Sequence, residues 1–102
     1  MKKQTIDFKE VRYHDLNGTE YPIPDVWAKG FGNAIYLGGD IPTSELGSKI
    51  YHSDKNDKVV DLDQEELTLL LNIIEHSSQL GAPAQRALKA YLTYKLDNLN
   101  NQ

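Results

Sequence analysis

The sequence predicts an α+β domain in which an N-terminal β-hairpin packs on three to four helices, the last two forming a C-terminal antiparallel helix pair. Three observations predict this fold. An Asn17-Gly18 turn lies between two stretches rich in strand-forming residues. A capping-box sequence opens a strongly apolar helix at Asp63. An alanine- and leucine-rich stretch follows that helix after a short turn, so it is expected to fold back on it.

The first strand is predicted over Thr5–Tyr13, and the apolar pattern around the turn sets its register. A two-residue loop pairs Leu16 with Thr19. A three-residue loop instead pairs Asp15 with Thr19, and it gathers four apolar residues on one face: Val11, Tyr13, Tyr21 and Ile23. Because register follows the apolar face, we predict the three-residue loop, with Gly18 in the left-handed region.

Two helices are predicted before the central one. In the first, four residues share a helical face: Trp27, Phe31, Ala34 and Ile35. Asp25 is expected to cap the start of this helix, and Gly38-Gly39 is expected to end it. Glycines at 30 and 32 disfavour a helix, so a strand over Asn33–Leu37 is an alternative; if the helix forms, they indicate close approach of another backbone. A second helix is expected over Thr43–His52, capped by Thr43 or Ser44.

The central helix lies in the most apolar stretch, Asp61–His76. Asp63 and Glu66 have capping-box spacing. The next apolar residues have the i, i+3, i+4, i+7 spacing of one helical face: Leu67, Leu70, Leu71 and Ile74. Leu69 and Ile73 widen this surface, so the helix is expected to be covered on more than one side, by its own chain or by a partner. A short strand over Lys58–Leu62 precedes it and can extend the hairpin to a three-stranded sheet.

The final helix begins near Pro83, a residue suited to the first helical turn. Its expected inner face carries alanine, leucine and tyrosine: Ala84, Ala87, Leu88, Tyr91, Leu92 and Leu99. The length of 102 residues suits a single domain spanning 1–102. Residues 1–4 and 98–102 are expected to fray because they are polar and terminal.

Composition excludes several classes of protein. The net charge of −4, with a pI near 5.2, offers no basic stripe for a nucleic-acid backbone. There is no cysteine, so a disulfide framework or thiolate metal site is excluded. The N-terminus lacks the apolar segment of a signal peptide, and the apolar runs are too short to span a membrane. We therefore expect a cytoplasmic protein, in the host cytoplasm if a phage encodes it.

Candidate catalytic and metal-binding residues are scarce. His14, His52 and His76 are far apart in sequence and are interpreted as surface or boundary residues. Asp54-Lys55-Asn56-Asp57 resembles part of a calcium loop but lacks its glycine and closing glutamate. No phosphate-binding, nucleophile-elbow or zinc-protease motif is present. We expect no catalytic residue, no metal and no cofactor.

Aromatic and apolar residues are the better functional signal, because aromatics favour protein interfaces. Six residues form the candidate interface: Trp27, Phe31, Tyr36, Leu69, Ile73 and Tyr94. Tyr36 and Tyr94 fall off the apolar faces and are expected to be exposed. Trp27 and Phe31 have a second interpretation, which we favour, as ordinary core residues.

Two short sequences, FGNAIY at Phe31–Tyr36 and SKIYH at Ser48–His52, precede a VVDLDQEE segment at Val59–Glu66 and an alanine/leucine helix. In this order they resemble a group of small phage and prophage proteins, including those of gut Bacteroidetes. The D-x-x-G turn of that group corresponds to Asp15–Gly18. The resemblance covers most of the chain from about Phe8 onward, with Gly47-Ser48 departing from the usual alanine. It implies no activity, and its motifs are interpreted as packing and capping signals.

These observations predict a non-enzymatic interaction protein of a phage or mobile element that binds a protein partner. It is expected to be capable of homo-oligomerisation through the Leu67–Ile74 or alanine-rich surface. One alternative is a small-molecule or nucleotide-binding protein that sequesters a host signal. An anionic ligand would then need a pocket formed by Lys29, Arg12 or Arg86. Another alternative is a phage assembly factor.

Overall fold

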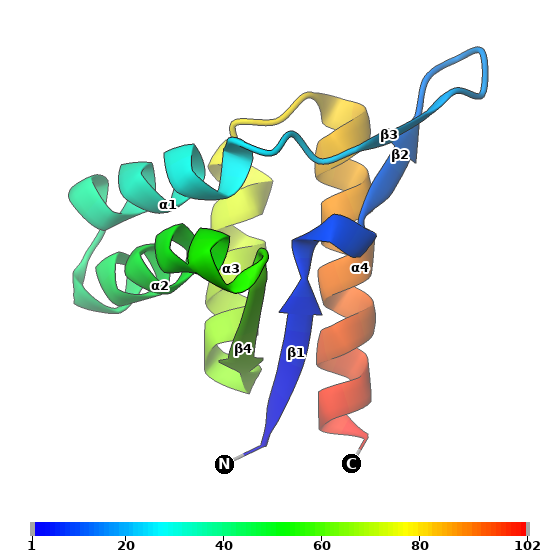
Figure 1. Cartoon of the computed structure of the whole chain (residues 1–102). Helices are drawn as coiled ribbons and strands as arrows, with labels where there is room; N and C mark the ends of the chain where they lie inside the picture. The colour runs from blue at the N-terminus through cyan, green and yellow to red at the C-terminus, as the bar shows by residue number, and fades with distance from the viewer. Residues whose placement is uncertain (1, 102) are drawn as a thin grey trace.

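The computed structural model describes residues 2–101 and confirms an α+β fold. The described chain contains four α-helices, two short 3-10 helices and two antiparallel strand pairs (Figure 1). The elements run in this order: β1 (Lys3–Asp7), η1 (Phe8–Glu10), β2 (Arg12–His14), β3 (Glu20–Pro22), α1 (Trp27–Gly38), α2 (Ile41–His52), η2 (Ser53–Asn56), β4 (Val59–Asp63), α3 (Gln64–Ser77) and α4 (Ala82–Asn100).

The strands form two separate pairs, so the suggested three-stranded sheet is wrong. The expected strand over Thr5–Tyr13 is interrupted by η1, which turns the chain between β1 and β2. As a result, β4 pairs with β1 and the hairpin stands apart. Ile6 lies opposite Val60, and the Thr5 hydroxyl donates to the Asp61 carboxylate at 2.8 Å on the outer face.

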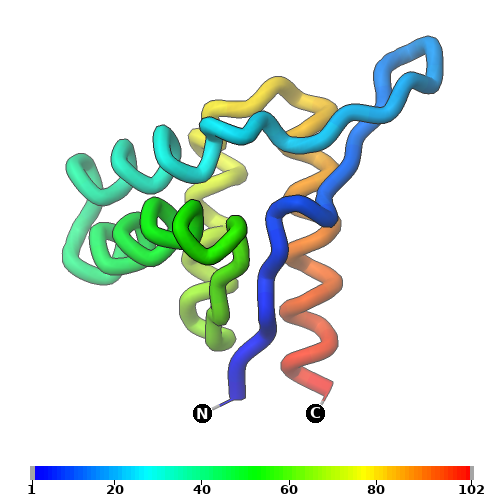
Figure 2. Tube along the Cα trace, viewed as in Figure 1, coloured from blue at the N-terminus to red at the C-terminus, as the bar shows by residue number. Residues whose placement is uncertain are grey.

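The hairpin has the predicted register. Tyr13 pairs with Tyr21, and the Asp15 amide donates to the Thr19 carbonyl at 3.1 Å. Gly18 closes the three-residue loop with φ of 85°, a conformation that suits glycine. The Tyr13 and Tyr21 rings stack with centroids 5.6 Å apart. This hairpin projects from one end of the molecule, at the upper right of Figure 2.

The antiparallel pair of α3 and α4 forms the body of the fold with β1 and β4 (Figure 1). The predicted capping box opens α3: Asp63 accepts from the Glu66 amide at 2.8 Å, and Glu66 accepts from the Asp63 amide at 3.1 Å. The turn between the helices ends at Gly81, and α4 has proline in its first turn as expected. Apolar residues of both helices and of the strands are fully buried, including Ile6, Leu62, Leu67, Leu70, Ile74, Leu88 and Leu92.

Helices α1 and α2 form an antiparallel hairpin that projects on the opposite side from the β-hairpin (Figure 2); we call it the arm. Residues 33–37 are helical, so the strand alternative is wrong. Gly32 and Gly47 let the two backbones touch: a Cβ on Gly32 would lie 2.7 Å from the Gly47 carbonyl oxygen. The close approach predicted for the glycines therefore holds at Gly32. Gly30 lies on the exposed side of α1, facing away from the α1–α2 crossing.

The predicted caps of the arm helices are wrong. Val26 is the N-cap residue of α1 and makes no side-chain capping hydrogen bond, so Asp25 does not cap this helix. Helix α2 begins at Ile41, two residues earlier than expected, because Asp40 accepts from the Thr43 amide at 3.0 Å. Pro42 then occupies the first turn, where a missing amide costs nothing.

The ends are ordered further than predicted. Lys3 and Gln4 belong to β1, paired with Asp63 and Leu62. Helix α4 continues through Asn100, and buried Leu99 anchors its last turn. Met1 and Gln102 lie outside the described residues.

Trp27 joins the arm to the body. Its indole nitrogen donates to the carbonyl of Ser78, just after α3, at 2.7 Å. Its ring stacks on Phe31 with centroids 4.8 Å apart and meets the edge of Phe8 at 5.3 Å. All three aromatic residues are buried in one hydrophobic cluster with residues of α2, α3 and α4.

Candidate interaction site

The structure does not bring the six predicted interface residues together. Trp27 and Phe31 are buried in the core, so their assignment to a surface is wrong and the core interpretation holds. Leu69 and Ile73 are half-buried against the core cluster. Tyr36 and Tyr94 are exposed as predicted, with 51% and 62% of their surface accessible, but they lie on α1 and α4 respectively.

Tyr36 belongs to a groove along the arm with a volume of about 260 Å³. Asn33 and Tyr36, spaced i, i+3, line it from α1. Three residues spaced i, i+3, i+4 line it from α2: Ser48, Tyr51 and His52. Because Gly32 and Gly47 bring the backbones together, these larger side chains stand on either side of the contact. We call this feature the arm groove.

Hydrogen bonds and ring contacts hold the α2 wall of the groove in place. The Nδ1 atom of His52 lies 2.8 Å from the Ser48 carbonyl oxygen and 3.3 Å from its hydroxyl. The Tyr51 and His52 rings meet edge to face, with centroids 5.3 Å apart. The Lys29 ammonium lies 5.8 Å from the centroid of the Tyr51 ring. The groove therefore presents ordered aromatic surfaces with amide, hydroxyl and imidazole groups between them.

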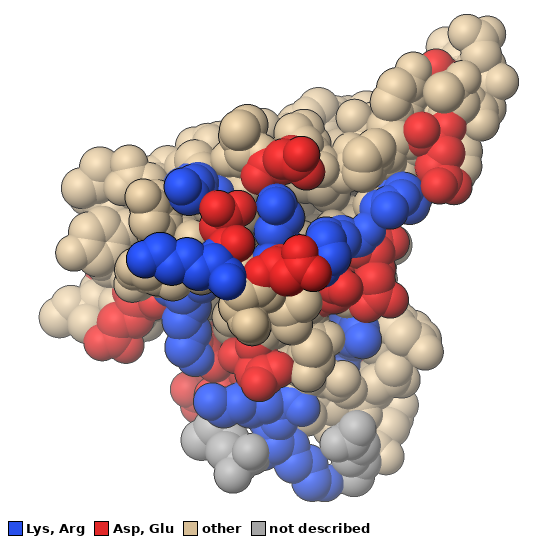
Figure 3. Space-filling model, in the orientation of Figure 1, with Lys and Arg blue, Asp and Glu red and all other residues tan. Residues whose placement is uncertain are grey.

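The surface at the end of the arm is apolar and carries few charges. Leu37 and Ile41, either side of the α1–α2 turn, are 73% and 75% accessible. Within α1 and α2 the acidic and basic residues are Lys29, Glu45 and Lys49, besides His52. Figure 3 shows on one face that charged side chains gather over the centre of the molecule and the inner part of the arm, whereas the outer end of the arm is largely uncharged.

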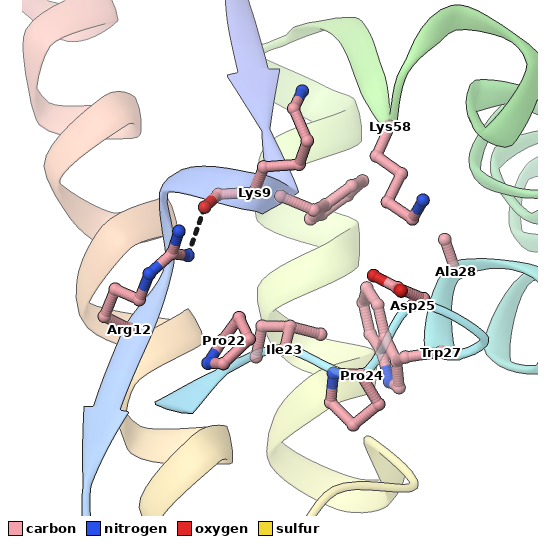
Figure 4. A pocket seen from close by; sticks show the side chains of 10 residues that line it. Lys9, Arg12, Pro22, Ile23, Pro24, Asp25, Trp27, Ala28 and Lys58 are labelled. Carbon is pink, nitrogen blue, oxygen red and sulfur yellow. Dashed lines mark hydrogen bonds between the residues drawn. The ribbon is translucent and has the colours of Figure 1, made fainter. Parts of the chain in front are cut away.

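A second hollow, of about 200 Å³, lies between η1 and the segment joining β3 to α1 (Figure 4). Its apolar lining includes Phe8, Pro22, Ile23, Pro24, Trp27 and Ala28, and its ionisable lining residues are Lys9, Arg12, Asp25 and Lys58. Of the three cations expected to converge on a ligand, Arg12 lines this pocket. Lys29 and Arg86 do not.

The cations around this pocket already have partners. Lys9 pairs with Asp7 at 2.9 Å and Asp57 at 3.3 Å. Arg12 lies 3.6 Å from Glu20, and its guanidinium donates to the carbonyl of Lys9. Burial pushes the pKa of Asp7 upward, but the hydrogen bonds and charge of Lys9, together with Arg12, outweigh burial and hold that pKa below its ordinary value. An incoming anion would therefore compete with carboxylates of the chain.

Metal-binding and membrane-spanning features are not found in the described residues. The three histidines are exposed, as predicted, and lie on β2, α2 and α3. No group of three histidine or carboxylate side chains in residues 2–101 is placed to hold a metal ion. None of the described helices combines the length and apolar character needed to cross a membrane.

Comparison with known proteins finds no matching family model, no matching curated protein and no matching solved structure. The site is therefore defined by its own geometry. Sequence reasoning missed four of its five residues: Asn33, Ser48, Tyr51 and His52. The signal was the pair of short sequences at residues 31–36 and 48–52, whose exposed members meet in the groove, although both were interpreted as packing signals.

Proposed function

We propose that this chain is a non-enzymatic interaction protein that binds a protein partner through the arm groove. The observation that carries the proposal is the groove itself: two tyrosines, a histidine, an amide and a hydroxyl line a cavity with no carboxylate, lysine or arginine in its described lining. Depletion of charge and enrichment in tyrosine are typical of the central part of protein interfaces.

The position of the groove also supports binding. It lies on helices that are packed closely at Gly32 and Gly47, so its walls are fixed before a partner arrives. Preformed sites lose less conformational entropy on binding than flexible ones. The exposed Leu37 and Ile41 provide further apolar surface at the end of the same arm. Because the chain resembles small phage and prophage proteins, we propose that it acts as an interaction protein of a phage or other mobile element.

The arm groove replaces the surfaces first considered for self-association. Leu67, Leu70 and Ile74 are fully buried within the chain, and Ala84 of α4 is buried as well. A second chain cannot reach these residues without unfolding the helix pair. A partner must therefore bind elsewhere than these four residues; Ala82 and Ala90 of α4 are exposed, but among the described residues the arm groove combines a concave surface with two exposed tyrosines.

Photo-crosslinking with a matched control tests this function. A photoreactive phenylalanine analogue is placed at Tyr36 in the groove or at Tyr94 on α4, two exposed tyrosines on different elements. We expect a discrete crosslinked protein product in the source cells from position 36 and none from position 94. Substituting Tyr51→Ala in the position-36 protein should reduce the yield. Equal products from both positions, or none from position 36, would contradict a groove-specific partner.

The small-molecule alternative has one observation in its favour, the pocket of Figure 4, which combines an apolar lining with Lys9, Arg12 and Lys58. Native mass spectrometry of protein purified without refolding separates the two functions. A monomer that carries a small extra mass would favour ligand sequestration. A phage assembly factor, the remaining alternative, would instead appear as a large ring or filament that persists on dilution.

A further inference from the structure

The β-hairpin projects at the other end of the molecule from the arm (Figure 1), and the loop at its tip carries one large apolar side chain, Leu16. Leu16, in the three-residue loop, is fully exposed. Asp15 fixes the loop that carries it: one carboxylate oxygen accepts from the amides of Asn17 at 2.8 Å and Thr19 at 3.0 Å. The other accepts from the Tyr21 hydroxyl at 3.0 Å. Leu16 is thus held outward on an ordered turn.

The charges near the tip and near the groove are opposite. At the tip, Glu20 lies 3.6 Å from Arg12 and 3.5 Å from His14, whereas Asp15 has amide and hydroxyl partners and no cation partner among residues 2–101. Near the groove, the Lys29 ammonium lies 3.8 Å from Asp54, which also pairs at 3.5 Å with Lys58, a residue that lines the pocket of Figure 4. Lys29 also lies over Tyr51 of the groove wall. The tip therefore has an excess negative charge, and the cluster of Lys29, Asp54 and Lys58, which meets the groove through Lys29, has one more lysine than carboxylate.

We propose that the arm groove receives the hairpin tip of a second copy of this chain, with Leu16 between Tyr36 and Tyr51. This inference rests on the proposed function, because it requires the groove to bind protein, and it identifies the partner. The leucine would leave water for an aromatic cavity that has no charge in its described lining, so insertion buries no unpaired ion. Asp15 would approach the Lys29 side of the groove.

The arrangement has a definite assembly consequence. The hairpin tip with Leu16, which we call the knob, and the arm groove are different surfaces of one chain. The contact is therefore heterologous and repeats head to tail, giving open chains or rings. A hairpin tip in a groove is also a small interface. We therefore expect association that grows with protein concentration and continues beyond the dimer.

Two charge variants test this inference by complementation. Leu16→Asp disables the knob and leaves the groove, and Tyr36→Asp disables the groove and leaves the knob. Both positions are exposed, so both variants should fold with the parent's melting temperature. Sedimentation velocity over a concentration series should show the parent passing beyond a dimer, while each variant alone stays monomeric. An equimolar mixture should form a 1:1 dimer and no larger species.

Every other outcome overturns the inference. A parent that stays monomeric at all concentrations excludes self-recognition, but leaves a foreign partner at Tyr36 to the crosslinking experiment, so the two failures are distinguishable. Association lost in Tyr36→Asp but retained in Leu16→Asp shows that the groove receives another part of the second copy. Association lost in both variants and not restored by mixing excludes the head-to-tail contact. Association retained in Tyr36→Asp places the interface elsewhere.

Discussion

At the scale of single residues, the arm depends on the absence of two side chains. A Cβ at Gly32 would lie 2.7 Å from both the Gly47 carbonyl oxygen and the Tyr51 amide nitrogen. Both atoms are backbone, so neither can rotate away. Helices α1 and α2 would have to separate, and the walls of the arm groove would move with them. One glycine contact therefore links the packing of the arm to the geometry of the proposed site.

Gly32→Ala should accordingly destabilise the protein despite the higher helix propensity of alanine. Overpacking of this kind costs about 1–3 kcal/mol. Gly30→Ala, two residues earlier in the same helix, is the control. Its Cβ would make an ordinary 3.8 Å contact with Gln79, so we expect it to gain up to about 1 kcal/mol. Urea denaturation measures both changes, and a Gly32→Ala protein as stable as the parent would show that the helices are not in backbone contact.

At the scale of elements, the hairpin was predictable in detail because local chemistry decides its register. The turn sequence and the apolar alternation agree on a three-residue loop, and the structure has that loop. The same reasoning worked for the capping box of α3. The partner of β4 was not predicted, because a strand pattern does not specify its neighbour. The strand is also broken at Phe8–Glu10, where Asp7 accepts from the Lys9 amide and Phe8 is buried.

The stability of the hairpin turn is also expected to depend on pH, because Asp15 titrates. The hydrogen bond from the Thr19 amide is the largest single cause of the lowered Asp15 pKa. The Tyr21 hydroxyl and the amides of Asn17 and Gly18 add to it, and together they outweigh desolvation. Because the folded pKa lies below the unfolded one, the stabilisation is present above the unfolded pKa, near pH ~4. It is lost as the pH falls through the folded value.

An NMR titration of the Asp15 carboxyl carbon tests whether the pKa of Asp15 is lowered in the folded protein. Its midpoint in the protein should lie below that of a short peptide containing Asp15–Gly18. The Thr19 amide shift should follow the same curve. In Asp15→Asn, which keeps a side-chain acceptor but has no titrating group, the Thr19 amide should be insensitive to acid over this range. A midpoint equal to the peptide's would mean that the turn does not hold the carboxylate.

At the scale of the whole molecule, the site was less predictable than the fold. Helical periodicity separated Tyr36 from the core residues of α1, and the structure confirms that Tyr36 is exposed. The groove, however, depends on how α1 and α2 cross, which Gly32 and Gly47 determine together from opposite sides of a turn. No local pattern in either helix specifies that crossing. The second wall, Ser48, Tyr51 and His52, could be assigned only from the structure.

Residues 2–101 share one hydrophobic core, and the single tryptophan of the chain lies where the arm meets the body. Trp27 contacts Phe31 in its own helix, Phe8 of η1 and the carbonyl of Ser78 beyond α3. Detaching the arm would therefore expose the indole and also remove its contact with Phe8 of η1. We conclude that the arm is not an independent unit that can detach while the body stays folded.

Urea denaturation followed by two probes tests that conclusion. Tryptophan fluorescence reports Trp27 at the junction, and far-UV circular dichroism reports all the helices, more than half of whose residues lie in α3 and α4. Coincident transitions with equal midpoints are expected if the chain unfolds in one step. A fluorescence transition at lower urea than the circular dichroism transition would instead show that the arm separates first. The arm groove would then be a surface whose position changes with solution conditions.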